Sequence, residues 1–328
     1  MRKIVSFLLV SVILAACSGN GERKRVLVAS RGLPSELLLV VDRSVWDSDL
    51  QDTINSIVEG QVPGLLQAEK MFRVTRIFSN DTDPAYLTFH TKLAVRMDSS
   101  LDKPLMGTRR DEYARPQLEL VVAAPSMEAL RVYLSQNAER IRDILADAQI
   151  EFRAMELRKQ YSKKVSDDLN RVLGMTICVP AHMGATKTGE NFLWGSTNLI
   201  EKDLNLVVYT YDMPDGDVFN LEAFVAKRDS VMQKNIPGER PDQWMQTARE
   251  KGSPLVVGRR RKDDGQGVLE IRGLWEMRNG ALGGPFVSIV RVDSAAGRVI
   301  VGEGFVYSPS TDKRDLVRQM EAALRTLK

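Results

Sequence analysis

Two stretches with the same order of residues decide how this chain is divided. The first is LELVVAAPS at residues 118–126, and the second is GFVYSPS at residues 304–310. In each, an apolar run typical of a strand is followed by Pro-Ser and then by a helical pattern, and serine is a common first residue, or N-cap, of helices. The similarity indicates two α+β halves with a boundary near Gly174. Coincidence between two ordinary strand-to-helix turns is the alternative.

The first half, residues 34–173, alternates between strand and helix patterns. Strands are expected over residues 36–42, 71–78, 86–95 and 118–123, with a helix over residues 46–58 between the first two. From Ser126 to Leu173 the sequence contains no Gly or Pro and keeps an apolar helical stripe. This run predicts either one very long helix or two joined helices, and Gly174 is a natural stop.

The second half, residues 174–328, is richer in strand signals. Strands are expected over residues 175–179, 191–194, 204–211, 255–257, 268–277, 286–292 and 299–307, with helices over residues 218–233 and 311–327. The fold class predicted for the whole chain is α+β, with two mixed α/β halves and mainly antiparallel sheets.

The amino terminus has the pattern of a lipoprotein export signal. Arg2-Lys3 precedes a mostly apolar run of 13 residues from Ile4 to Ala16, and Cys17 follows directly. A membrane-spanning helix needs about 20 apolar residues, whereas the apolar part of an export signal needs roughly 7–15. Small residues before the cysteine resemble the bacterial lipobox. We therefore expect a signal peptide over residues 1–16, lipid on Cys17 and a flexible tether over residues 17–33.

The sequence of the tether and the charge balance limit where the protein can be located and which partners it can bind. No aspartate follows Cys17, which by resemblance to lipoprotein sorting signals favours the outer membrane, facing the periplasm. Removing residues 1–16 lowers Lys plus Arg from 46 to 44 against 43 acidic residues, a net charge of +1. This balance gives no reason to expect nucleic acid as a partner. The expected partners are the membrane, through the N-terminal lipid, and an envelope protein or a glycan.

The residue types that bind metals or form disulfides are scarce. The chain has two cysteines, so lipidation of Cys17 leaves Cys178 without an intramolecular partner, and we expect a buried thiol there. Only His90 and His182 could supply imidazole ligands, so no metal or cofactor is predicted. Acidic residues at 81, 83, 212, 215 and 217 leave a calcium site open, although turn-forming roles are favoured.

A set that resembles the motifs of serine β-lactamases occurs in the right order but in the wrong context. It comprises Ser100-Leu101-Asp102-Lys103, Ser135-Gln136-Asn137 and Lys187-Thr188-Gly189. The serine should open a buried helix, yet Pro104 directly follows Lys103. No catalytic residues are predicted.

A glycine-rich aromatic hairpin is the strongest candidate for a ligand or partner surface. It contains Trp275, Gly283, Gly284 and Phe286. Glycines allow another group to approach the backbone closely, so a binding surface is one interpretation. A tight hairpin with a tryptophan in the core is the other.

Several segments together resemble a known family. They are the lipobox, Arg31-Gly32-Leu33-Pro34-Ser35-Glu36-Leu37, Pro63-Gly64-Leu65, and the hairpin with Trp275 and Gly283-Gly284-Pro285-Phe286. They resemble the uncharacterised lipoproteins grouped as domain of unknown function 4837, over nearly the whole mature chain. The resemblance implies a lipid-anchored protein without an assigned activity. A non-enzymatic binding or envelope-maintenance module, a hydrolase of peptidoglycan or glycan, and a carrier of a small apolar molecule remain open.

Overall fold

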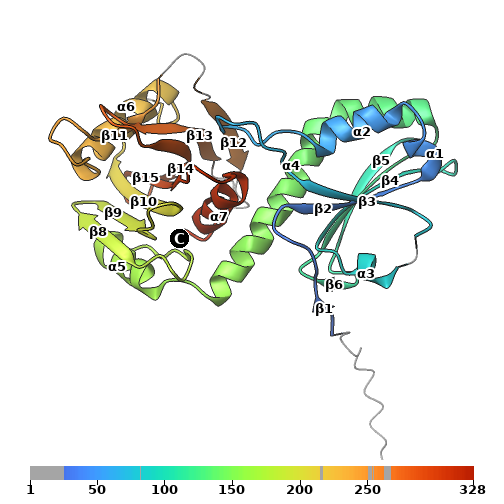
Figure 1. Cartoon of the computed structure of the whole chain (residues 1–328), viewed down its shortest axis with the longest axis horizontal. Coiled ribbons are helices and arrows are strands. Elements are labelled where there is room, and N and C mark those ends of the chain that lie inside the picture. Colours follow the sequence, from blue (N-terminus) through green and yellow to red (C-terminus); the bar gives the residue numbers. More distant parts are fainter. Residues whose placement is uncertain (1–25, 82, 215–216, 250–252, 254, 262–266) are drawn as a thin grey trace, which may run out of the picture.

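The computed structural model describes residues 26–81, 83–214, 217–249, 253, 255–261 and 267–328, and it confirms the α+β class. Two bodies flank a long helix, α4 (Met127–Lys159), in Figure 1. The predicted signal peptide and Cys17 lie outside the described residues. Within the predicted tether, β1 (Val28–Ala29) already pairs in parallel with β6 (Ala114–Arg115). No helix in the described ranges is long and apolar enough to cross a membrane.

The first half is built on a five-stranded sheet in the order β3-β2-β4-β7-β5. The strands are β2 (Glu36–Val41), β3 (Arg73–Phe78), β4 (Thr91–Met97), β5 (Leu105–Arg110) and β7 (Leu118–Ala124). β2, β3, β4 and β7 are parallel and only β5 is antiparallel, so mainly antiparallel pairing does not describe this half. The helices α1 (Arg43–Trp46), α2 (Leu50–Val58) and α3 (Pro84–Leu87) lie in the connections, which parallel strands require.

Helices α2 and α4 cover one face of this sheet. Their buried residues include Leu50, Ile54, Ile57, Leu130, Leu134, Ile141 and Leu145, which pack on Leu37, Leu39, Leu93 and Leu120 of the strands. Fully burying one such side chain contributes roughly 1.5–3 kcal/mol. The periodic apolar stripe of α4 is therefore what attaches this helix to the sheet.

The run without Gly or Pro forms two helices. After α4 ends at Lys159, Ser162 caps α5 (Lys163–Leu173) by accepting a hydrogen bond from the backbone N–H of Val165 at 3.4 Å. Gly174 ends α5 in a left-handed conformation, as expected. α5 packs into the core of the second half together with the end of α4, since Ile150, Ala154 and Leu157 of α4 share one cluster with Val165 and Leu169 of α5.

The second half contains an eight-stranded sheet in which every pair is antiparallel. Its order is β11-β13-β14-β15-β10-β9-β8, and β12 also pairs with β13. The strands are β8 (Ala185–Gly189), β9 (Phe192–Ser196), β10 (Asp203–Asp212), β11 (Met245–Thr247), β12 (Val256–Arg261), β13 (Gly267–Met277), β14 (Gly283–Asp293) and β15 (Arg298–Tyr307). α5 and α7 (Arg314–Leu324) cover one face, and α6 (Leu221–Asn235) covers part of the other.

Two expectations for the second half are wrong in detail. Residues 175–179 join no sheet; instead, the backbone of Thr176 exchanges hydrogen bonds of 2.9 and 3.0 Å with Lys328. Cys178 in this segment is free and half-buried, not fully buried. The segment is apolar because Met175 and Ile177 fill the core under α7, a burial that does not require a strand.

The repeated strand-Pro-Ser-helix order does not reflect a repeated fold. The first copy ends β7 of the mostly parallel sheet, where Ser126 caps α4 as expected. The second copy follows β15, but α7 begins only at Arg314 and has no side-chain cap of its own at Lys313. The similarity is therefore the coincidence of two local turns.

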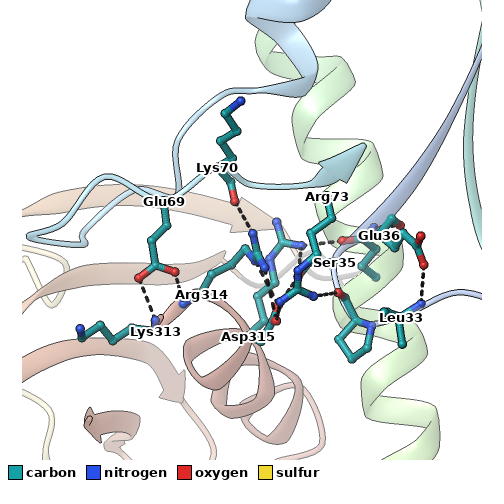
Figure 2. Close-up of polar contacts among 12 residues, drawn as sticks. Leu33, Ser35, Glu36, Glu69, Lys70, Arg73, Lys313, Arg314 and Asp315 are labelled. Carbon is teal, nitrogen blue, oxygen red and sulfur yellow. Dashed lines mark hydrogen bonds and ion pairs between the residues drawn. The ribbon is translucent and has the colours of Figure 1, made fainter. Parts of the chain in front are cut away.

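The cap of α7 comes from the other half of the molecule, as Figure 2 shows. The buried carboxylate of Glu69 accepts hydrogen bonds from the backbone N–H groups of Lys313 (2.7 Å) and Arg314 (2.8 Å). Asp315 accepts a further bond from the Ser35 hydroxyl at 2.6 Å and one from Arg73 at 2.6 Å. A carboxylate at a helix N-terminus is favoured by the helix dipole, so these contacts join the two halves at a fixed place.

Candidate ligand-binding groove

A groove of about 1010 Å³ lies on the α6 face of the large sheet. It opens where β9, β13 and β15 end and β10 begins, beyond the C-terminal end of α6. In antiparallel pairs, residues directly opposite each other point to the same face. Asn205 is opposite both Ser196 and Phe305, and Asp203 is opposite Tyr307, so one face of three strands supplies the floor.

Trp275 forms the aromatic part of this floor, and Gly284 makes room for it. The two residues are opposite each other on β13 and β14. A Cβ atom at Gly284 would lie 2.1 Å from the carbonyl oxygen of Val306 and 3.1 Å from Trp275 Nε1. Without that atom, Nε1 donates a hydrogen bond to the Val306 carbonyl at 3.2 Å, and Phe305 meets the indole edge-on at 5.4 Å. The absence of a side chain at Gly284 therefore leaves the space in which the indole of Trp275 bonds to the Val306 carbonyl.

A hydrogen-bond chain fixes the second tryptophan of the groove. Trp194 Nε1 donates to Asn205 Oδ1 at 2.8 Å, and the Asn205 amide donates to Asp203 at 2.9 Å. The hydroxyls of Ser196 and Thr197 also donate to Asp203, at 2.9 and 2.7 Å. The Asp203 carboxylate is thus occupied by neighbouring side chains and serves to orient Asn205 and the indole of Trp194.

Three exposed apolar side chains line the groove. Leu199 and Ile200, in the loop between β9 and β10, are 52% and 91% exposed, and Leu282, between β13 and β14, is 44% exposed. Scattered apolar residues are ordinary on protein surfaces, but these three line one concavity. The arrangement exposes apolar surface to a ligand in addition to the aromatic surface of the floor.

Of the four hairpin residues that were predicted to form a binding surface, Trp275 alone lines the groove. Trp275 lines the groove but is 4% exposed, and Gly283 and Gly284 begin strand β14, which pairs with the strand of Trp275. Phe286 faces the core, where the Arg228 guanidinium lies 4.1 Å above its ring. The core interpretation holds for Phe286.

The core beside Phe286 contains a buried ion pair. Arg228 donates to both carboxylate oxygens of Glu303, at 2.8 and 2.7 Å, and neither side chain is exposed. Burial opposes the charge of Arg228, but Glu303 outweighs it, so the pKa of Arg228 is raised. Burial, reinforced by Glu303, also raises the pKa of Tyr209 well above its ordinary value. This pair holds α6 against the sheet, and the segment that directly follows α6, from Ile236 to Glu239, lines the groove.

Sequence patterns missed most of the groove. Trp194, Asn205 and Phe305 come from three strands, and no short motif connects them. Leu199-Ile200 was the available signal, because two consecutive apolar residues between polar neighbours in a loop indicate exposed apolar surface.

The other candidate chemistries are not assembled. Ser100 lies in the turn after β4, Ser135 on α4, and Lys187 on β8 of the other half, where its amine donates to the Asn235 carbonyl. Asp81 and Asp83 accept backbone hydrogen bonds within their own turn. Across the ranges that the structure describes, no three His, Cys, Asp or Glu residues converge in a way that could hold a metal ion.

The groove lies wholly within a segment that matches a family model. The model described as domain of unknown function (DUF4837) matches residues 162–326, half of the chain. The chain belongs to this family. A second model, domain of unknown function (DUF8532), matches residues 30–158. The DUF4837 match is therefore confined to the second half, and Arg31–Leu37 and Pro63–Leu65 lie outside it.

Comparison with individual proteins adds little. No curated protein matches the sequence. The Ran-binding protein Mog1p of Saccharomyces cerevisiae superposes with a TM-score of 0.31 at 8% identity, covering 47% of this chain and 89% of Mog1p. A protein from Bacteroides thetaiotaomicron superposes with a TM-score of 0.19 at 8% identity, covering 47% of this chain and 44% of the other. Superpositions this poor support no statement about fold or function.

Proposed function

We propose that this protein is a lipid-anchored envelope protein that binds a largely apolar ligand in the groove of its second half, without catalysing a reaction. Lipid on Cys17 places it at the outer membrane, facing the periplasm. The ligand is an apolar segment of an envelope protein or a small apolar molecule with the same surface chemistry.

The groove is the observation that supports this proposal. Its volume of about 1010 Å³ is at the upper end of the roughly 300–1,000 Å³ that is usual for ligand pockets. Its aromatic side chains are held by hydrogen bonds to Val306 and Asn205, so they need little reordering when a ligand binds. Preorganisation of this kind lowers the entropic cost of association.

Displacement of a neutral apolar dye tests the groove. Nile red is bound to the purified protein and displaced in one arm by 1-dodecanol and in the other by an uncharged apolar hexapeptide. Ile200→Ser should weaken dye binding about tenfold, the equivalent of about 1.4 kcal/mol, because it removes most of an apolar side chain from the lining of the groove. Leu66→Ser is the matched control, since Leu66 is 75% exposed and lies in the other half.

The outcome of that experiment separates the alternatives. Equal affinity losses in Ile200→Ser and Leu66→Ser would show that the dye does not occupy the groove and would refute the proposal. Displacement by the peptide alone would identify a protein partner, and displacement by dodecanol alone would identify a carrier of small molecules.

The lipid anchor is tested separately by Cys17→Ala. This variant should leave the membrane fraction and appear in the soluble periplasmic fraction with the same melting temperature. A Cys17→Ala protein that stays with the membranes would contradict the anchor, whatever the result for the groove.

A further inference from the structure

A second cavity lies where the two halves meet, and side chains from both halves form its wall. It has a volume of about 250 Å³. The first half contributes His90, Gln149 and Arg153, and α7 of the second half contributes Asp315 and Arg318. The apolar groove shares none of these residues.

Arg318 is buried in this wall without a carboxylate partner. The side chain is 7% exposed, and its Nη1 donates to Ser35 Oγ at 3.0 Å and to Gln149 Oε1 at 2.5 Å. Both acceptors are neutral and both line the cavity. A guanidinium has five N–H donors. Among the described residues, Nε and Nη2 of Arg318 form no hydrogen bond, and no carboxylate lies within 4.0 Å of the guanidinium. Burial lowers the pKa of Arg318 to about 10, so it remains a cation at neutral pH.

A second guanidinium lines the same cavity. Arg153 of α4 is half-buried there, and no ion pair to it is found among the described residues. The acidic residues of the wall are already matched: Asp315 bonds to Arg73 and Arg314, and Glu156 pairs with Lys159 at 2.7 Å. Within the described residues, neither guanidinium of the cavity wall therefore has a carboxylate within 4.0 Å, and Glu321 and Asp315 act on the charge of Arg318 only from further away. Buried charges are ordinarily paired, because desolvation of a lone ion is costly.

A loop that lines the cavity has an unusual backbone conformation. Ser35 has a φ of +60°, which is uncommon for a residue other than glycine, and Gly32 has a φ of +120°. A Cβ at Gly32 would lie 2.5 Å from the imidazole of His90, whose Nε2 donates to the Leu33 carbonyl at 3.0 Å. Strained backbone of this kind concentrates at binding sites. It places the Ser35 hydroxyl between Asp315 and Arg318.

We infer that this cavity binds a small molecule through an oxyanion, a carboxylate or a phosphate, with Arg318 as the buried donor and Arg153 as the outer cation. Arginine suits such groups because its planar fork matches their geometry. The ligand contacts Arg318 on one side and α4 on the other, so binding also strengthens the contact between the halves. This site does not depend on the apolar groove.

Thermal unfolding of the full chain at constant ionic strength tests the inference. Inorganic phosphate forms one arm and succinate the other, with chloride as the reference. At least one anion should raise the melting temperature saturably above chloride. Arg153→Gln should weaken that anion about tenfold, as expected for one charge-assisted hydrogen bond. Arg158→Gln is the matched control, because Arg158 is exposed on the same helix and does not line the cavity.

The arms distinguish the ligand groups, and the variants decide the site. A response to phosphate alone points to a phosphate ester, and a response to succinate alone to a carboxylate. No response above chloride in either arm overturns the inference, as do equal losses in Arg153→Gln and Arg158→Gln. Arg153→Gln should fold normally, since the structure gives Arg153 no partner among the described residues.

Discussion

Replacing Gly284 by alanine tests whether Trp275 can pack in its place only because residue 284 has no side chain. The new Cβ would lie 2.1 Å from the Val306 carbonyl oxygen, far inside van der Waals contact, and 3.1 Å from the indole nitrogen. Strand β14 lies between β13 and β15, so the clash cannot be relieved at a free edge. Trp275 must move, and its hydrogen bond to Val306 must break.

The expected cost follows from three contributions. Overpacking in a core costs about 1–3 kcal/mol. Loss of the hydrogen bond adds about 1 kcal/mol. The smaller entropy of the unfolded alanine chain offsets about 0.4–1 kcal/mol of this. The free energy of unfolding should therefore fall by about 1–3.6 kcal/mol.

Denaturant titration followed by tryptophan fluorescence is the assay, with Gly107→Ala as the control. Gly107 lies on β5, has no left-handed φ, and a Cβ there would meet no atom within 4 Å. That control should be neutral or slightly stabilising. Gly284→Ala should also shift the emission to longer wavelength as the indole becomes more exposed. Equal unfolding free energies for the two variants would refute the role assigned to Gly284.

Three further predictions concern charged and titrating groups. Arg228→Met should lower the unfolding free energy by about 3–5 kcal/mol in denaturant titration, because it leaves Glu303 buried without its partner, and adding Glu303→Leu should restore much of the loss. Burial acts to raise the pKa of Asp315, but hydrogen bonds from Arg314, Ser35 and Arg73 outweigh it and hold that pKa low. The ionised Asp315 carboxylate therefore stabilises the folded state at pH values above the unfolded pKa of about 3.9. This stabilisation is lost as the pH falls through the lower pKa of the folded state. Asp315→Asn should accordingly lose about 1–2 kcal/mol at pH 7, and calorimetric scans should show this difference from the unmodified chain vanishing in acid. Burial lowers the pKa of His90, so protonation of this imidazole is less favourable in the folded state than in the unfolded state. The free energy of unfolding should therefore fall as the pH drops below about 6.5. An equally steep decline in His90→Gln would show that another group is responsible.

Local patterns in the sequence were sufficient to predict most elements. The apolar run before Pro125 predicted a strand, and Ser126 predicted the start of α4, because both signals depend on neighbours within a few residues. The same logic overextended the strand expected over residues 86–95, where Asp83 and Pro84 begin the short helix α3. Patterns of this range carry no information about which strands become neighbours.

Pairing of distant segments was decided only by the tertiary structure. Sequence alone predicted the α+β class and the hairpin that contains Trp275, which the structure confirms, whereas the export signal over residues 1–16 stays a prediction. The sequence could not show that Glu69 caps a helix more than 240 residues later, because no local rule relates the two positions. Nor could it bring Trp194 and Asn205 beside Trp275, since that juxtaposition depends on strand order and register across the whole sheet.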